Sequence, residues 1–366
     1  MRLQSLHLTN FRKFHDLHLD IDQSCDIICF VGANTLGKTN ILEAMYFLGL
    51  LKSFRTVDTK DLVTWEENFL SIEGKFLDGN IENMIATTVF RPKKQRRYTV
   101  NGVELPIAEY VGKLNVVFFS PDDINLLLLS PSNRRKYLDI LLSQTDIQYF
   151  RAYVNYQKIL KQRNALLKII RENRNRVSEL DYWNEGLVDA GLVLIEKRKE
   201  LIEFFNQHIG ASYREISENK DAEYALEYLP SLKSEVLNKE NYLQALHERL
   251  ERDLILESTS TGPHRDDFTF LLNGKNIEAF ASRGDTRSMI LALKLNEITF
   301  IKERNGTLPL LLLDDVFSEL DDERQEQLLS HIPEGIQTFI TSTTDAIGSV
   351  KKRKKDICFV NLTEII

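Results

Sequence analysis

The chain has 366 residues, which exceeds one average domain of roughly 150 residues and predicts about two lobes. Hydrophobic residues make up 43% and charged residues 28%, a balance that excludes a disordered or fibrous protein and provides for a sizeable core. The net charge of −7 argues against uniform affinity for nucleic acid, so any contact with DNA must be local.

No targeting or membrane segment is evident in the pattern. Met1 leads directly into an alternating run rather than a basic and then apolar leader. The longest apolar stretches, such as residues 308–313, fall far short of the roughly 20 residues that a membrane helix needs. Cys25 and Cys29 lie in a predicted buried strand and Cys358 lies far along the chain, which indicates neither a disulfide framework nor a zinc site. We therefore expect a cytoplasmic protein in a reducing compartment, with no membrane association.

The first 50 residues predict an α/β opening of two strands, a Gly-rich turn and a helix. Residues 25–31 form a short apolar run, and Ile41, Leu42, Met45 and Leu48 recur at helical spacing.

The Gly-rich turn matches the phosphate-binding P-loop pattern G-x-x-x-x-G-K-[ST], between a strand and a helix as that motif requires. Its glycines let backbone N–H groups face phosphates at a helix N-terminus. Lys38 supplies a charge to the β and γ phosphates of ATP, and the Thr39 hydroxyl can bind Mg²⁺. A chance Gly-rich turn is the alternative. The predicted ATP-binding residues here are Gly32, Ala33, Asn34, Thr35, Leu36, Gly37, Lys38, Thr39 and Asn40.

Residues 70–120 predict a β-rich region, with strands at 84–90, 98–100 and 115–119. The surest element is a hairpin that turns at Asn101 and Gly102, because this pair accepts the positive φ angles of a tight turn.

A long helical lobe is predicted over residues 132–217, where Gly and Pro are nearly absent and apolar residues recur at helical spacing. A gap at 173–178 divides it into a helical hairpin. Strand signals return past residue 253 and end in two apolar runs, at 310–313 and 337–342. We interpret these runs as strands of the first sheet, so that residues 1–130 and 253–366 form an α/β core into which a helical lobe, residues 131–252, is inserted.

Two carboxylates follow the apolar run at 310–313. A P-loop needs an acidic partner at the carboxyl end of a neighbouring strand, and this run places Asp314 and Asp315 there. We expect Asp314 to hold Mg²⁺ and Asp315 to orient or deprotonate the attacking water as a general base. A helix cap after the strand is the alternative.

Short motifs spread over nearly the whole chain carry a family resemblance. They are NFRKF at 10–14, the P-loop with Asn40, FSPDD at 119–123, SNRR at 132–135, QRN at 162–164, TGPHRDD at 261–267, SRG at 282–284 and DDVFSELD at 314–321. Together they resemble the bacterial RecF recombination-repair family, within the wider SMC and ABC-type ATPase group. The resemblance implies an ABC-type P-loop ATPase head with an inserted, mainly helical lobe, whose ATP sites are completed by a second subunit.

The same resemblance assigns residues that would complete the ATP site of a partner subunit. In the signature segment, the Ser282 hydroxyl and the Gly284 amide would bind the γ-phosphate of the partner's ATP. Read alone, this segment is a helix cap. Asp285 stands where the family usually has Gln, and its carboxylate would repel a triphosphate unless it points away. Thr35 and Leu36 also depart from the family's usual loop without threatening binding.

Three further segments carry possible roles by resemblance. Residues 318–321 would form a D-loop that brings Asp321 near the partner's nucleotide, or would cap the following helix. Residues 341–344 occupy the place where many ABC ATPases have a histidine, so any switch role would belong to hydroxyls. Arg12 and Lys13 could reach a nucleotide phosphate or base, or could lie in a surface turn.

DNA would contact basic patches, because phosphate contacts give affinity that is independent of base sequence. Arg134–Arg135–Lys136 and residues 161–163 are weaker candidates than the hairpin. Residues 351–355 contact DNA or only solubilise the last strand. His264 and Arg265 carry no obvious chemistry, and we assign them to the surface between the lobes. The strongest candidates flank the predicted hairpin, where the alternative is a solvated charged turn: Arg91, Lys93, Lys94, Arg96 and Arg97.

The interpretation that follows is a slow, DNA-stimulated ATPase of DNA repair, replication and the SOS response. ATP binding would close a homodimer on double-stranded or gapped DNA, and hydrolysis would reopen it. By resemblance, its partners would be the RecR and RecO mediators, which assist the loading of RecA. Two other classes stay open, the ATPase subunit of a membrane transporter and an ATP-binding module without turnover, whereas an SMC-type structural tether would need hundreds of coiled-coil residues that this sequence lacks. Association with membranes would favour the transporter subunit, and ATP binding without hydrolysis would favour the module without turnover.

Overall fold

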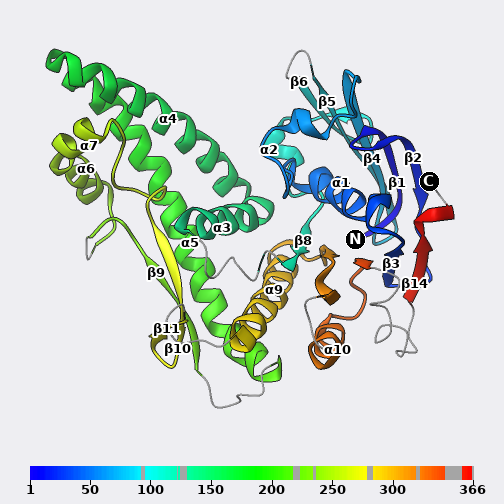
Figure 1. Ribbon diagram of the computed structural model, residues 1–366. Coiled ribbons are helices and arrows are strands. Elements are labelled where there is room, and N and C mark those ends of the chain that lie inside the picture. Colours follow the sequence, from blue (N-terminus) through cyan, green and yellow to red (C-terminus); the bar gives the residue numbers. More distant parts are fainter. Residues whose placement is uncertain are drawn as a thin grey trace. The chain divides into compact units, whose positions relative to one another are not determined.

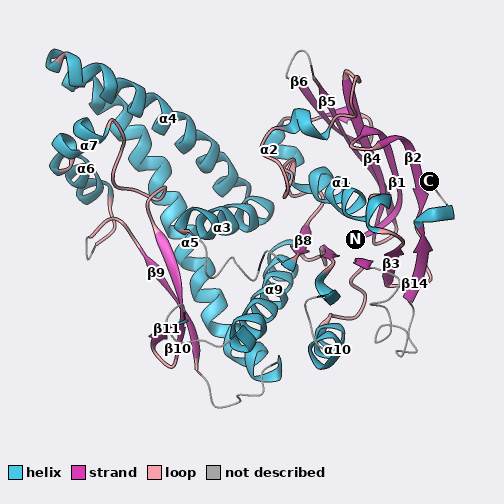
Figure 2. Cartoon of the chain, in the orientation of Figure 1, coloured by secondary structure: helices cyan, strands magenta, loops and turns pink. Residues whose placement is uncertain are grey.

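The computed structural model describes residues 1–91, 95–121, 123, 130–216, 223–233, 236–277, 283–318, 322–342 and 357–364. The chain divides into two compact units, the first formed by Met1–Ile124 with Ile290–Ile366 and the second by Asn125–Met289. Figure 1 labels the elements of both units, and Figure 2 distinguishes their helices from their strands. Within the described ranges, none of the helices combines the length and the apolarity that crossing a bilayer requires.

The first unit contains an antiparallel sheet of six strands in the order β2-β1-β4-β5-β6-β7. Alternation along β1 buries Leu6 and Leu8 on one face, after a shift of register between Leu3 and Ser5. The predicted hairpin is confirmed, because Asn101 and Gly102 adopt φ angles of 52° and 80° between β6 and β7. The strands are β1 (Arg2–Phe11), β2 (Phe14–Asp20), β4 (Phe69–Asp78), β5 (Ile81–Phe90), β6 (Gln95–Val100) and β7 (Val103–Glu104).

A parallel sheet of five strands, ordered β14-β3-β13-β12-β8, completes the core of the first unit. Helix α1 (Lys38–Leu50) contacts strands of both sheets and is buried along most of its length, so it shows no polar face. The two apolar runs predicted as strands of the first sheet form β12 and β13, which confirms that prediction. The strands are β3 (Ile27–Val31), β8 (Val116–Phe119), β12 (Leu310–Asp314), β13 (Thr338–Ser342) and β14 (Ile357–Asn361).

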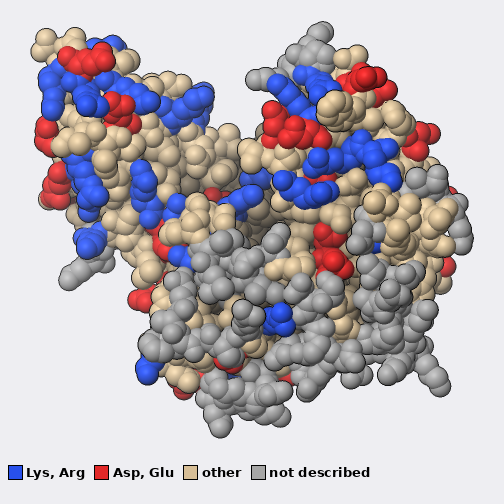
Figure 3. Space-filling view, in the orientation of Figure 1, with Lys and Arg blue, Asp and Glu red and all other residues tan. Residues whose placement is uncertain are grey.

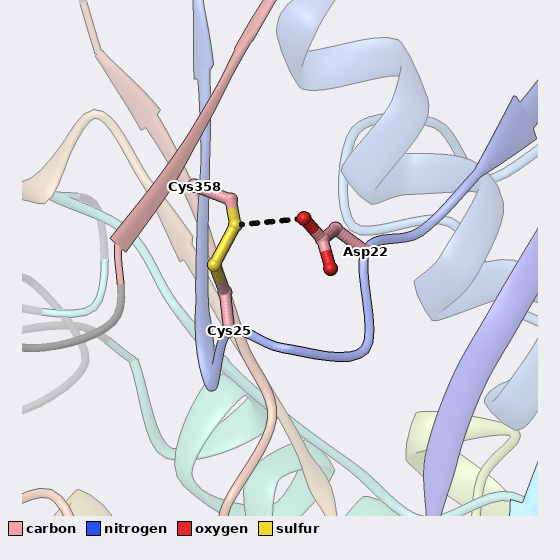
Figure 4. Close-up of side chains that lie close together, drawn as sticks. All are labelled: Asp22, Cys25 and Cys358. Atoms are coloured by element: carbon pink, nitrogen blue, oxygen red, sulfur yellow. Dashed lines mark hydrogen bonds between the residues drawn. A yellow bond between two sulfur atoms is a disulfide. The ribbon is translucent and has the colours of Figure 1, made fainter.

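The expectation of no disulfide is wrong, because Cys25 and Cys358 are bonded to each other. They are 333 residues apart in sequence, but β14 pairs with β3 in parallel and brings their Cα atoms to 5.8 Å. Figure 4 shows the pair, with the Asp22 carboxylate 3.5 Å from the Cys358 sulfur. Cys29 is buried and has a free thiol. Strand pairing, which no local pattern of cysteines reveals, therefore decides the disulfide.

The second unit is mainly helical and contains the predicted helical hairpin. Helices α4 and α5 pack against each other on either side of a 3-10 turn at Arg174–Glu179. A further break, which the sequence pattern did not predict, falls at Asp146, whose carboxylate accepts from the amides of Gln148 and Tyr149 and caps α4. The elements are α3 (Pro131–Thr145), α4 (Ile147–Glu172), α5 (Leu180–Ile216), α6 (Lys239–Glu248), α7 (Leu250–Leu256), β9 (Tyr224–Leu229), β10 (Asp267–Leu272) and β11 (Lys275–Asn276).

The second unit extends to Met289, beyond the boundary predicted at residue 252. Strand β10 lies past that boundary but pairs with β9 in a three-stranded sheet of this unit. Asp253 forms an ion pair with Arg163 on α4. Residues 253–289 therefore belong to the second unit and not to the α/β core in which they were predicted. The chain passes from the second unit to the first within α9 (Arg283–Asn305), and the remaining helices are α2 (Ile107–Tyr110) and α10 (Asp322–His331).

Candidate nucleotide-binding site

The P-loop connects β3 to α1 and contains two glycines in backbone conformations that other residues rarely adopt. Gly32 has a φ of +143°, and a Cβ there would lie 2.7 Å from Leu36 Cδ1. Gly37 has a φ of +88° and caps α1 at its N-terminus. The loop thus delivers the chain to a helix start, where free backbone N–H groups favour an anion.

Lys38 is a buried cation, 7% exposed, that is held by neutral groups. Its ammonium donates to the carbonyl oxygens of Gly32 and Ala33. Burial lowers its pKa, while the more distant charges of Asp315 and Asp314 act to raise it. Within the described part of the chain no carboxylate lies at ion-pair distance from the Lys38 ammonium. Its charge therefore remains available to an anion such as a phosphate.

Asp314 ends β12 and accepts hydrogen bonds from two hydroxyls. Thr39 Oγ1 donates to Asp314 Oδ1 at 2.9 Å, and Thr341 Oγ1 donates to the same oxygen at 2.7 Å. Burial raises the pKa of Asp314, which the two hydroxyl bonds partly oppose. The two predicted Mg²⁺ ligands, Thr39 and Asp314, are thus adjacent although 275 residues separate them in sequence. A hydroxyl beside a carboxylate is an all-oxygen ligand set suited to Mg²⁺.

Asp315 is exposed and adopts a left-handed backbone conformation, with a φ of 50°. Asp tolerates this region better than most residues. The Asp315 amide donates to Thr341 Oγ1 at 2.9 Å. Thr341 therefore contacts both members of the acidic pair, at the position where the resemblance suggested a hydroxyl.

Arg12 and Lys13 both contact the region around the P-loop. The Arg12 guanidinium donates to both carboxylate oxygens of Glu43, at 2.8 and 2.7 Å, and to the carbonyl of Asp61 at 3.0 Å. Lys13 donates to the carbonyl of Thr35 at 2.9 Å. Arg12 therefore forms an ion pair with buried Glu43 of α1, whereas the exposed Lys13 side chain contacts the P-loop itself.

Arg55 is a residue of this region that the sequence analysis missed. Its Nη1 donates to Asn40 Oδ1 at 2.9 Å, and its charge acts to lower the pKa of Asp314. Ser53, close to it in sequence, donates to Glu43 Oε1 at 2.5 Å. No motif marks this segment, because only its return over α1 brings it to the site.

Several predicted residues lie outside the described part of the structure. Of the signature segment, Gly284 lies in α9, and the Asp285 carboxylate accepts from the Tyr213 hydroxyl at 3.1 Å within the second unit. Asp285 is therefore engaged in its own chain. The predicted residues outside the described ranges are Ser282, Asp321, Lys93 and Lys94, together with residues 343–344, 351–355 and the side chain of Asn34.

The described cations of the predicted DNA-binding hairpin are exposed. Arg96 donates to Thr59 Oγ1 at 3.0 Å, Arg97 pairs with Glu104 at 3.3 Å, and Arg91 follows the end of β5. On the face of each unit drawn in Figure 3, Lys and Arg side chains are interspersed with Asp and Glu. This arrangement agrees with local rather than uniform DNA contact.

Two weaker predictions need correction. Arg134 is buried and forms a two-fold hydrogen-bonded pair with Asp267, so it is not a surface cation for DNA. Arg163 is fully buried in a pair with Asp253 and is likewise inaccessible. His264 has its hydrogen-bond partners, Tyr156 and the carbonyl of Thr259, inside the second unit.

Comparison with known proteins agrees with this geometry. A family model described as RecF/RecN/SMC N terminal domain matches residues 2–362. The DNA replication and repair protein RecF of Halalkalibacterium halodurans is 39% identical over 349 residues, which cover 94% of this chain and 93% of the relative.

Solved structures give the same result. A structure titled as the recombination mediator protein RecF with ATPrS in the RecFOR pathway matches with a TM-score of 0.88 and 32% identity, over 99% of this chain and 96% of that one. A corresponding RecF–ATP structure matches with a TM-score of 0.86 and 34% identity, over 93% and 92% of the two chains. The fold is an ABC-type P-loop ATPase head with an inserted, mainly helical lobe, and the chain belongs to the RecF family.

Proposed function

We propose that this protein is an ATP-dependent DNA-binding protein of recombinational repair and replication restart. ATP binding joins two heads through composite sites on duplex or gapped DNA, and slow, DNA-stimulated hydrolysis separates them. The observation that carries this proposal is the 2.9 Å hydrogen bond from Thr39 of the P-loop to Asp314 at the end of β12. The names of the full-length relatives and structural neighbours support the assignment to repair in the RecFOR pathway.

In this proposal each residue of the ATP site in the first unit has a defined role. Lys38, whose ammonium donates to the carbonyls of Gly32 and Ala33, binds the β and γ phosphates, and the N–H groups at the start of α1 hold their oxygens. Thr39 and Asp314 are the ligands for Mg²⁺, which when bound neutralises charge on the phosphate oxygens. Asp315 orients or deprotonates the attacking water, while Thr341 holds the position of the acidic pair.

A second copy of the chain would complete each ATP site. Its Ser282 and Gly284 bind the γ-phosphate at the start of α9, and its Asp321 lies near the nucleotide. The hydrogen bond from Tyr213 to Asp285 supports this role, because a carboxylate engaged in its own chain repels the phosphate less than a free one. Loss of the γ-phosphate removes the contact across the dimer, so hydrolysis releases it.

DNA contact is assigned to the hairpin cations Arg91, Lys93, Lys94, Arg96 and Arg97, which bind phosphates without reading bases. The RecR and RecO mediators would be partners of the DNA-bound dimer, which assists RecA loading in the cytoplasm. A salt-dependent affinity follows from these contacts, because neutralising phosphates releases counterions.

Light scattering of the full chain tests the composite site. With ATP and Mg²⁺ the mass should double, and a gapped duplex should be retained by the doubled species. Lys38→Arg should weaken hydrolysis, and Asp315→Asn should bind ATP without turnover and stay dimeric on DNA. An Asp315→Asn variant that remains monomeric with saturating ATP would refute the composite site, while ATP binding by a wild type that never hydrolyses it would favour a module without turnover.

A further inference from the structure

The second unit contains a polar pocket of about 210 Å³ that no task of the ATP site uses. Helices α3, α4 and α5 and the segment around His264 line it, and every lining residue belongs to the second unit. Three lining side chains are cations and one is a carboxylate: Arg135, Lys136, Arg198 and Asp139.

The carboxylate neutralises one cation and holds it in place. Arg198, 2% exposed, donates to Asp139 Oδ1 at 2.6 Å and to the carbonyl of Pro263, also at 2.6 Å. Its Nε donates to the Tyr149 hydroxyl at 3.1 Å, and that hydroxyl donates to Asp139. Arg198 and Asp139 thus form a fixed ion pair in the lining of the pocket.

Arg135 and Lys136 differ from Arg198 in their partners. Arg135 Nη1 donates to the backbone carbonyl of Asp266 at 2.7 Å, and in the described ranges neither cation forms an ion pair. Burial, followed by repulsion from Arg198, lowers the pKa of Arg135, while Asp267, Asp139 and Asp266 act to raise it. The lining of the pocket nevertheless holds three cations against one carboxylate, which suits an anion.

The nearby carboxylates of Asp266 and Asp267 offset part of this positive charge, but of the two only Asp267 is paired with a cation in the described ranges, and that cation is Arg134. Asp266 accepts from the Ser231 amide at 2.7 Å and from the Tyr228 hydroxyl at 2.5 Å. Asp267 accepts two hydrogen bonds from Arg134, at 2.7 and 2.6 Å.

Three polar groups of the lining share one face at the start of a helix. Ser132, Arg135 and Lys136 stand at i, i+3 and i+4 in the first turns of α3, so their side chains project to the same side. A hydroxyl, a guanidinium and an ammonium near a helix N-terminus are donors suited to a tetrahedral oxyanion.

We propose that this pocket is a binding site for a phosphate group, separate from the P-loop. A phosphate monoester carries a charge of about −1.5 to −2 at pH 7, which complements a lining of three cations and one carboxylate. The pocket is smaller than the roughly 300–1,000 Å³ of sites that enclose a whole ligand, so it takes the phosphate and leaves the rest of the molecule outside. The phosphate belongs to a free nucleotide or to DNA, two sources of the same chemistry.

His264 provides a local reporter of occupancy. Its Nδ1 accepts from the Tyr156 hydroxyl at 2.6 Å and its Nε2 donates to the carbonyl of Thr259 at 2.9 Å, so the ring is neutral and fixed beside the pocket. An anion bound next to it changes the electric field at the ring.

The test is NMR of the full chain with ¹³C-labelled histidine, titrated with inorganic phosphate at pH 7 against potassium chloride of equal ionic strength. The chain has seven histidines, and His264→Gln assigns the signal. We expect a saturable shift of the His264 resonance with phosphate and none with chloride.

Three variants locate the effect while leaving the P-loop intact. Arg135→Gln should weaken phosphate binding about tenfold, the loss of one charge-assisted hydrogen bond. Lys136→Gln changes an exposed side chain, should fold normally and should weaken binding several-fold. Lys158→Gln, an exposed lysine of α4 outside the pocket, is the matched control and should bind as the wild type does.

The outcomes separate the proposal from its alternatives. A His264 signal that phosphate does not shift, or a shift that Arg135→Gln and Lys136→Gln leave unchanged, overturns it. Titration with a nucleoside 5′-monophosphate and with duplex DNA then identifies the source, according to which of them shifts the signal at the lower concentration. The inorganic phosphate experiment does not depend on DNA binding, so failure of the proposed function would leave this result interpretable.

Discussion

The ATP site of the first unit and the Arg163 pair of the second unit hold buried charge differently. In the first unit, Lys38 is held by backbone carbonyls and Asp314 by two hydroxyls. In the second unit, Arg163 and Asp253 are both fully buried and pair at 2.8 Å. A buried charge that only neutral groups hold remains attracted to a charged ligand, whereas a buried ion pair is satisfied and fixes structure. The bonding partner of a buried charge, rather than its burial, therefore distinguishes a ligand-binding charge from a structural one.

The units also differ in how they join segments that are distant in sequence. The first unit joins its N-terminal and C-terminal parts by strand pairing and by the Cys25–Cys358 disulfide. The second joins its helices and the following loops by the Arg163 and Arg198 networks. The disulfide and the arginine networks can each be removed without the other.

The largest effect is expected from breaking a buried pair. Arg163→Met should lower the free energy of unfolding by about 3–5 kcal/mol, because Asp253 would be left as an uncompensated buried charge. Arg171 lies on the same helix in an exposed pair with Glu257, and Arg171→Met should cost no more than about 1 kcal/mol. Urea denaturation measures both, and equal losses would contradict the distinction between buried and exposed pairs.

The disulfide should contribute somewhat less. Its reduction should lower the free energy of unfolding by about 2–4 kcal/mol, because it closes a very long loop in the unfolded chain. Protein purified without reductant should show one free thiol after denaturation, Cys29, out of three cysteines. Cys358→Ala, which forms no bridge, should lose its sensitivity to reductant, and three reactive thiols in the untreated protein would exclude the bridge.

His264 should give the second unit a pH-dependent stability. Burial, with the charges of Arg265 and Arg135, lowers its pKa to about 4, against the opposing effects of Thr259 and Asp266. Between pH 6.5 and 4 the unfolded chain binds a proton that the folded chain does not, so stability falls as the pH falls. At pH 5 the loss from this group is about 2 kcal/mol.

Urea denaturation at pH 7 and pH 5 measures this loss of stability. His264→Gln should lose about 2 kcal/mol less than the wild type between the two pH values. An unchanged difference in the His264 variant would show that the ring is protonated in the folded protein.

The smallest effect on stability is expected at the ATP site. Lys38→Met removes a buried charge that only carbonyls hold, so the free energy of unfolding should stay within about 1 kcal/mol of the wild type. ATP binding, measured by calorimetry, should be lost. A large loss of stability instead would place Lys38 with the structural charges of the second unit.

Local patterns in the sequence determined much of this molecule. The P-loop, the acidic pair after β12, the Asn101–Gly102 turn and the α4–α5 hairpin follow from glycine positions, apolar periods and turn residues, which act over a few neighbouring positions. The sequence also carried the family resemblance, through motifs that each lie within one short segment.

Only the tertiary structure decided which distant residues meet. The pairing of β14 with β3 created the disulfide, and the pairing of β10 with β9 moved the boundary of the second unit. Arg135 and Arg163 are both arginines on helices, yet Arg135 lines a pocket and donates to a backbone carbonyl, whereas Arg163 pairs with Asp253 in the core. Sequence spacing could not separate them, because the free energy of a charge depends on which groups the fold brings within a few ångströms of it.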